Sequence, residues 1–149
     1  MITRLPRPEE CQEILGEHQA FCELVTRLYR ILAEHTEPAG RVGHLLENLR
    51  ERLEAHFHDE EQAGVLDEIA RRAPQLAEMV QRLAAEHETF RNQLKGLEAL
   101  LATEERLTPA LWNQLETEFR AFQDRLMHHE SVENDLLQQT FSQDLGGKD

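Results

Sequence analysis

Residues 56–60 read HFHDE and combine two histidines with two acids. Residues four positions apart lie on the same face of an α-helix, so His56 and Glu60 would point in one direction. The same His-x-x-x-Glu spacing returns at His129 and Glu133. Two pairs of imidazole and carboxylate on separate helices indicate a metal site between helices.

Apolar residues recur at steps of three and four in four long stretches of the chain, which is the period of amphipathic helices. The predicted helices are about 9–35, 39–68, 74–105 and 109–140, with a tail at 141–149. Short connections between such helices favour antiparallel neighbours. The sequence therefore predicts an all-α, up-down-up-down four-helix bundle that forms a single domain over residues 1–149.

Proline marks the helix starts. Proline is tolerated in the first helical turn because the missing N–H has no intrahelical partner there. Thr108 is a predicted N-cap for the last helix. Gly64 is a predicted kink inside the second helix. The prolines at the predicted starts are Pro8, Pro38, Pro74 and Pro109.

Each apolar stripe is interrupted by a histidine, and the four histidines fall at similar heights. His18 lies 17 residues before the predicted end at residue 35, and His56 lies 17 residues after the predicted start at residue 39. The other two corners agree within two residues, or about 3 Å of helix. The four imidazoles are therefore expected to meet in the bundle, at His18, His56, His87 and His129.

Six polar groups converging in an apolar core need a compensating partner, because burying them unpaired would be costly. A pair of metal ions supplies one, with Glu60 and Glu133 as bridges and the imidazoles completing the coordination. Nitrogen and oxygen donors without thiolate suit iron or manganese better than a closed structural zinc site. A plain structural bundle with polar core histidines is the alternative. The predicted metal ligands are His18, His56, Glu60, His87, His129 and Glu133.

The composition limits the partners and the compartment. A formal charge of −13, from 29 acids and 16 basic residues, disfavours nucleic acid and anionic membranes. No apolar run of about 18 residues or signal peptide is present, and Cys11 and Cys22 lie about 16 Å apart on one predicted helix, too far to pair. We expect a reduced, cytoplasmic protein without membrane spans, as a monomer or a homodimer.

At these residues the chain resembles the hemerythrin-like family of HHE cation-binding domains over nearly its whole length. The resemblance implies two iron ions, for which Mn or Zn are possible substitutes, held by the six predicted ligands. Oxygen-carrying hemerythrins have a further histidine one turn after the third-helix ligand, where this chain has Arg91; this argues against reversible oxygen carriage. The matching motifs are residues 17–19, 56–61, 86–88 and 129–134.

A set of four histidines and two glutamates looks more like the di-iron domains of iron–sulfur cluster repair proteins, which are associated with nitric oxide and peroxide stress. Those proteins usually carry an extra amino-terminal domain that we do not expect here. The ferritin-like class is excluded because its Glu-x-x-His spacing does not occur.

We therefore expect a protein that binds, senses or reduces a small oxidant (dioxygen, peroxide or nitric oxide) and receives electrons from an unknown reductant. Carrier, sensor and oxidoreductase remain open alternatives, as does an iron- or redox-sensing module that signals to a protein partner.

Several neighbours of the predicted ligands have alternative roles. His128 is an alternative to His129, which fits the apolar stripe better. His58 and Asp59 are expected to face water. Arg91 is expected to extend outward rather than border the site, and Cys22 to be a buried, inert thiol.

Overall fold

The computed structural model of the protein describes residues 8–102 and 108–141. All regular structure in these ranges is helical, so the prediction of an all-α protein is confirmed. The predicted tail and the last residues of the third predicted helix lie largely outside the described residues. The elements are α1 (Pro8–Glu34), α2 (Ala39–Ala63), α3 (Val65–Arg72), a 3-10 turn η1 (Pro74–Leu76), α4 (Ala77–Ala102) and α5 (Pro109–Phe141).

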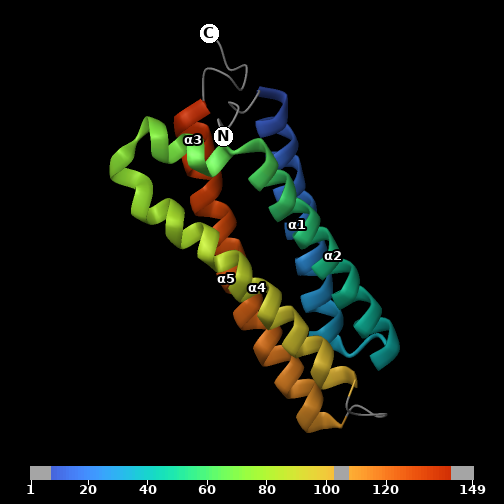
Figure 1. Ribbon diagram of the computed structural model, residues 1–149. Coiled ribbons are helices and arrows are strands. Elements are labelled where there is room, and N and C mark those ends of the chain that lie inside the picture. The colour runs from blue at the N-terminus through green and yellow to red at the C-terminus, as the bar shows by residue number, and fades with distance from the viewer. Residues whose placement is uncertain (1–7, 103–107, 142–149) are drawn as a thin grey trace.

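Four long helices surround a common core. Helix α1 packs against α2 and α5, and α4 packs against the same two helices (Figure 1). This arrangement is a four-helix bundle in which every long helix has two long neighbours. Among the described residues, no helix combines the length and apolar character needed to cross a lipid bilayer.

The predicted start signals of α1 and α5 are confirmed. Pro8 and Pro109 are the first residues of these helices. The N–H of Leu111 donates to the Thr108 hydroxyl at 3.2 Å, which satisfies one of the free donors of the first turn. The first residues of α1 and α5 are therefore predictable from local sequence signals.

The prediction of one continuous helix over residues 39–68 is wrong. Gly64 adopts a left-handed conformation, with φ 69° and ψ 26°, and its N–H still donates to the Glu60 carbonyl at 3.0 Å. That conformation ends α2, and glycine adopts it without steric cost. The kink expected at Gly64 is thus a complete break, after which α3 crosses the end of the bundle toward α4 (Figure 1).

The third predicted helix also begins differently. Residues Pro74–Leu76 form a 3-10 turn, and α4 starts at Ala77. Ala73 lies outside the helical region, with φ −134° and ψ 80°, because a residue before proline is disfavoured there. The connection between the second and third long helices therefore includes α3 and η1. The comparison of the heights of His56 and His87 from the sequence had assumed a short connection there.

Glu68 orients Arg72, the residue that connects α3 to α5. The buried Glu68 carboxylate accepts hydrogen bonds from Arg71 Nε at 2.8 Å and Arg72 Nε at 2.7 Å. Arg72 also donates to the Thr140 carbonyl at 2.9 Å and lies 4.8 Å from the centre of the Phe141 ring. Helix α3 is thus tied to the last turns of α5.

Replacing Glu68 with glutamine is expected to destabilise the protein at pH 7 by on the order of 1 kcal/mol, since it removes charged hydrogen bonds. Burial alone would raise the pKa of Glu68, but Arg71 and Arg72 outweigh it and lower the pKa. A lowered pKa gives stability that is complete above the unfolded-state pKa of about 4.5 and lost as the pH falls through the native value.

Urea unfolding of the wild type and Glu68→Gln at pH 7 and near pH 3 measures this effect. The difference between them should shrink at the lower pH. Glu61→Gln, an exposed acid at the end of α2, is the control and should show neither effect. A difference that is equal at both pH values would show that the carboxylate charge is not what holds α3.

The core consists of two apolar clusters along the bundle axis. The larger cluster contains Phe21, Phe57, Phe90 and Phe122, and the smaller one contains Ile69 and residues from α2, α3, α4 and α5. On α4 and α5, the histidine lies between residues of the larger cluster and residues of the smaller one. A polar layer at this height is thus enclosed by apolar side chains on both sides.

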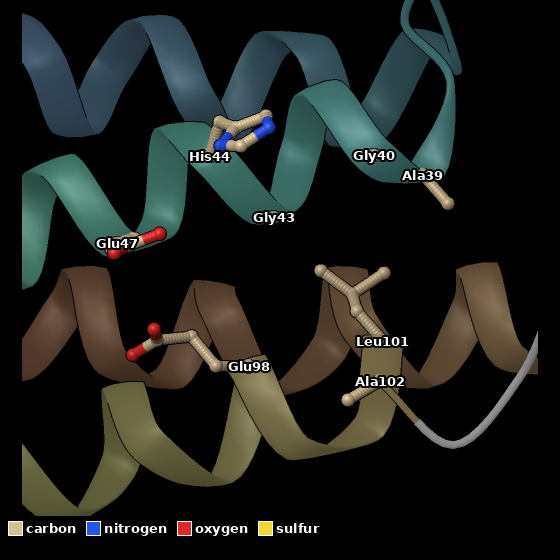
Figure 2. Close-up of a pocket in the computed structure, with 8 residues that line it drawn as sticks. All are labelled: Ala39, Gly40, Gly43, His44, Glu47, Glu98, Leu101 and Ala102. Carbon is tan, nitrogen blue, oxygen red and sulfur yellow. The ribbon is translucent and has the colours of Figure 1, made fainter.

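A separate groove lies between the first turns of α2 and the last turns of α4, with a cavity volume of about 490 Å³ (Figure 2). Gly40 and Gly43 leave it open, since a Cβ at either position would meet nothing within 4 Å. His56 lies 13 residues beyond Gly43 on α2, or about 20 Å along the helix. This groove is therefore distinct from the histidine layer.

Candidate metal centre

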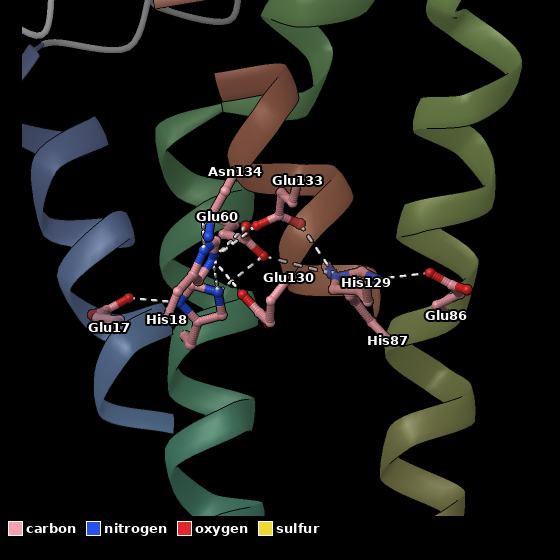
Figure 3. Close-up of polar contacts among 10 residues, drawn as sticks. Glu17, His18, Glu60, Glu86, His87, His129, Glu130, Glu133 and Asn134 are labelled. Carbon is pink, nitrogen blue, oxygen red and sulfur yellow. Dashed lines mark hydrogen bonds and ion pairs between the residues drawn. The ribbon is translucent and has the colours of Figure 1, made fainter. Parts of the chain in front are cut away.

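The structure brings all six predicted ligands together in the buried layer between the apolar clusters (Figure 3). Helix α1 carries one of them, α2 two, α4 one and α5 two. Each is at most 4% exposed, which is rare for glutamate unless it is paired. These residues are His18, His56, Glu60, His87, His129 and Glu133.

His18 Nε2 is the most crowded atom of the layer. It lies 3.0 Å from His56 Nε2, 2.9 Å from Glu133 Oε1 and 2.9 Å from Glu130 Oε2. One N–H cannot serve three acceptors at once, whereas a metal ion can accept a lone pair from every atom around it. His18, His56, Glu130 and Glu133 together form one group with metal-ligand spacing.

A second group with the same character consists of His87, His129 and Glu133. His129 Nε2 lies 3.3 Å from Glu133 Oε2. Glu60 Oε1 lies 3.5 Å from His87 Nε2 and 3.4 Å from His56 Nε2, so this oxygen stands between the two groups. The layer thus contains two adjacent clusters of donors rather than one.

Glu133 belongs to both groups. Its Oε1 faces His18, and its Oε2 faces His129. A carboxylate whose two oxygens point to different donor clusters has the geometry of a bridge between two cations. Glu133 is also completely buried, so water cannot compensate its charge.

Acidic and amide side chains orient the histidines from behind. Glu17 Oε1 lies 2.6 Å from His56 Nδ1, and Glu86 Oε1 lies 2.8 Å from His129 Nδ1 (Figure 3). Asn134 Oδ1 lies 2.5 Å from His18 Nδ1. Because these oxygens accept, each Nδ1 donates its proton outward and each Nε2 faces the layer. Outward partners of this kind fix the ring orientation of metal-binding histidines.

Without metal, the layer retains protons. Burial opposes protonation of His18, but Glu130, Glu133 and Glu60 outweigh it and raise the pKa of His18 to about 12. Burial and the nearby His18 lower the pKa of His56 to about 3. The carboxylates thus attract positive charge to His18, and a metal ion bound there would displace this proton.

The two central carboxylates also differ. Burial and the charge of Glu133 raise the pKa of Glu60. Burial would raise the pKa of Glu133 as well, but contacts with Glu60, His129 and His18 outweigh it and lower the pKa. The pKa values of the two carboxyl groups are therefore shifted in opposite directions, because two like charges in one buried site disfavour each other.

Apart from the ion-pair contacts of Glu130 and Glu133 with His18, several buried polar atoms of the layer have no hydrogen-bond partner among the described residues. They are both carboxylate oxygens of Glu60, Glu130 and Glu133, and Nε2 of His87 and of His129. Native structures leave few buried polar groups unpaired, and each one calls for an explanation. Ligation of metal by these atoms provides it, so the residues present fit a metal pair.

The sequence interpretation missed Glu130, which is 2% exposed and belongs to the first group. Its signal was present, because it lies four residues after Leu126 and three before Glu133, on the apolar stripe of α5. It also left the partners of the histidines unassigned. Glu17 and Glu86 each precede a histidine in the sequence but contact the histidine of the next long helix.

Three neighbours of the predicted ligands are exposed, as the sequence predicted. His58, Asp59 and His128 are exposed, while His129 is 1% exposed and lies in the layer. Arg91 donates to Glu88 at 2.9 Å and lies 5.6 Å from the centre of the Phe57 ring.

Cys22 is a free thiol that belongs to neither donor group. It is half-buried, which is less than the sequence predicted. Burial and the charge of Glu130 raise the pKa of this thiol.

Replacing Glu86 with glutamine is expected to weaken metal binding about 10- to 100-fold, because His129 would lose the carboxylate that orients it. Competition with a chromophoric chelator measures the affinity. Glu88→Gln is the matched control, since Glu88 is exposed and contacts Arg91. Equal affinities for wild type and Glu86→Gln would show that this contact does not support the centre.

No curated protein and no solved structure matches the chain. The family model described as the hemerythrin HHE cation-binding domain matches residues 12–141, which include all six predicted ligands and Glu130. The chain therefore belongs to the hemerythrin HHE cation-binding domain family.

Proposed function

We propose that this protein holds two iron ions in the buried layer and uses them to bind or reduce a small oxidant, which is dioxygen, peroxide or nitric oxide. The main support for this proposal is the position of Glu133, whose two oxygens face His18 and His129 in different donor groups. Glu60 supports the same arrangement, since one of its oxygens stands between His56 and His87.

The donor set favours iron. Both groups contain only imidazole nitrogen and carboxylate oxygen, and the free thiol of Cys22 belongs to neither. Such donors suit iron and manganese, with zinc as a possible substitute. When bound, a ferrous pair supplies electrons to the oxidant, and a separate reductant would restore them.

The chain's own residues prepare the site for this chemistry. Glu17 and Glu86 hold the rings of His56 and His129 so that each Nε2 faces inward. The Phe57 ring stacks on His87 with a centroid distance of 3.8 Å. Apolar packing on both sides of the layer excludes bulk water and strengthens the electrostatic interactions inside it.

We also propose that the helices follow the up-down-up-down order predicted from the sequence. The short connection between α1 and α2 supports this order, as does the packing of each long helix against two others. In that arrangement the four histidines come from four different helices at one height, which is how bundle metal sites are built.

Anaerobic reconstitution with ferrous iron, followed by admission of oxygen, tests the proposal. We expect two iron ions per chain and a new near-ultraviolet charge-transfer band after oxygen is admitted. Iron well below two per chain, together with no such band, would contradict the proposed function.

A further inference from the structure

The donor layer has two similar halves. In each half, a Glu-His pair on one helix faces a His-x-x-x-Glu motif on its neighbour, and the acid before the first histidine contacts the second histidine. One half is Glu17, His18, His56 and Glu60 from α1 and α2; the other is Glu86, His87, His129 and Glu133 from α4 and α5.

One position breaks this similarity. The residue after the histidine of each His-x-x-x-Glu motif contacts the lone histidine of the other half. Phe57 fills this position on α2, and its ring stacks on His87 at an interplanar angle of 9°. Glu130 fills it on α5, and its Oε2 lies 2.9 Å from His18 Nε2. An apolar ring and a carboxylate thus occupy equivalent places.

Glu130 has the environment of a ligand rather than of a surface acid. It is 2% exposed, and neither carboxylate oxygen has a hydrogen-bond partner among the described residues. Figure 3 shows its side chain directed toward His18, beside Glu60 and Glu133. The ion pair that Glu130 forms among the described residues is with His18 rather than with an arginine or a lysine. A buried carboxylate in this position needs a cation.

The opposite half has the reverse electrostatics. Arg91 lies one turn after His87, and its guanidinium lies 5.6 Å from the centre of the Phe57 ring that stacks on His87. A positive charge near a metal position disfavours the binding of a cation there. The half with His18 gains an anion, and the half with His87 has a cation nearby.

We propose that Glu130 is a seventh metal ligand that makes the two positions unequal. The position at His18 and His56 then has three donors of its own besides the bridging Glu60 and Glu133, while the position at His87 and His129 has two. The first position binds metal more tightly, and the second has more room for an outside ligand. This inference rests on the proposed two-metal centre.

A cavity of about 220 Å³ also indicates that an outside ligand binds at the His87 position. It is lined by Glu60 and His87 at the layer and by the exposed residues Glu61, Gln81 and Ala84 at the surface. The break at Gly64 forms part of its wall. Its volume exceeds that of several water molecules, so a triatomic ligand fits. The cavity leads to the His87 position, which has fewer donors from the chain.

Titration of the metal-free protein with Co²⁺ under anaerobic conditions tests the role of Glu130, with visible absorption and calorimetry as readouts. The wild type should bind two ions in resolved steps. Glu130→Gln should weaken the tighter step at least about tenfold and leave the weaker step unchanged. The control is Asp135→Asn, an exposed acid on the same helix, which should change neither step.

Two further variants keep the proposal testable if Glu130→Gln fails to fold. His87→Ala should retain the tighter step, and His18→Ala should retain only the weaker one. The proposal would be overturned if Glu130→Gln weakened both steps equally or weakened neither. It would also be overturned if the two histidine variants bound the remaining ion with equal affinity. Two equal steps in the wild type would overturn it without affecting the two-metal centre, whereas binding of fewer than two ions would contradict the centre itself.

Azide binding to the iron-loaded, oxidised protein tests the cavity. Ala84→Phe should narrow it and slow azide association at least about tenfold without changing the iron content. Ala85→Phe is the matched control, because Ala85 is exposed and does not line the cavity. Unchanged azide kinetics in Ala84→Phe, or equal slowing in both variants, would show that the ligand reaches the metals elsewhere.

Discussion

Replacing Glu133 with alanine is expected to remove both metal ions, with a loss of affinity greater than about 100-fold at each position. Glu133 is the residue shared by the two donor groups, and its oxygens face His18 at 2.9 Å and His129 at 3.3 Å. A directly bound carboxylate should matter more than the outer partners of ligands, which typically contribute 10- to 100-fold. Metal analysis after equilibrium dialysis measures the loss.

Asp135→Ala is the matched control for Glu133→Ala, since Asp135 is exposed two residues further along α5. Glu133→Gln preserves the side-chain shape and separates lost ligation from lost packing. Retention of one metal ion by Glu133→Ala would show that this carboxylate does not bridge the two positions. On α2, Glu60→Ala should likewise lose far more metal than Asp59→Ala, because only Glu60 of these two residues faces the layer.

Loading the protein with metal is expected to raise its melting temperature by on the order of 10 °C over the chelator-treated form. A ligand present at about 1,000 times its Kd stabilises the folded state by about 4 kcal/mol, and each kcal/mol corresponds to about 2–4 °C in a chain of this size. The physical reason is the burial of several carboxylate oxygens without hydrogen-bond partners in the metal-free layer.

Differential scanning calorimetry of the loaded and chelator-treated protein measures this shift. His58→Ala is a suitable control, because His58 is exposed and should leave the shift intact. A melting temperature that does not respond to metal or chelator would favour a plain structural bundle in which the histidines are polar core residues.

The sequence predicted most of the helical architecture because its boundary signals are local. Pro109 and the Thr108 cap define the start of α5 through the first turn alone. The break at Gly64 was underestimated, because a glycine inside a helix costs only about 1 kcal/mol and the apolar pattern continues beyond it. What ends α2 is the combination of the left-handed glycine and the anchoring of α3 to α5 through Arg72, which Glu68 orients.

The ligands of the metal centre could be predicted where a polar residue interrupts a regular apolar stripe. His87 stands out in this way on α4, and the same periodicity separates His129 from the exposed His128. Glu130 was missed because a single acid next to a ligand is usually solvated, and its position on the stripe alone does not distinguish it. The contacts of Glu17 and Glu86 cross between helices, so they depend on side-chain directions that spacing along one chain does not define.

The most direct test of the central claim is a crystal structure of the iron-loaded protein with anomalous difference density measured at the iron edge. Two peaks are predicted, one beside His18 and His56 and one beside His87 and His129, with Glu133 between them. A single peak, or iron bound only outside the buried layer, would contradict the two-metal centre.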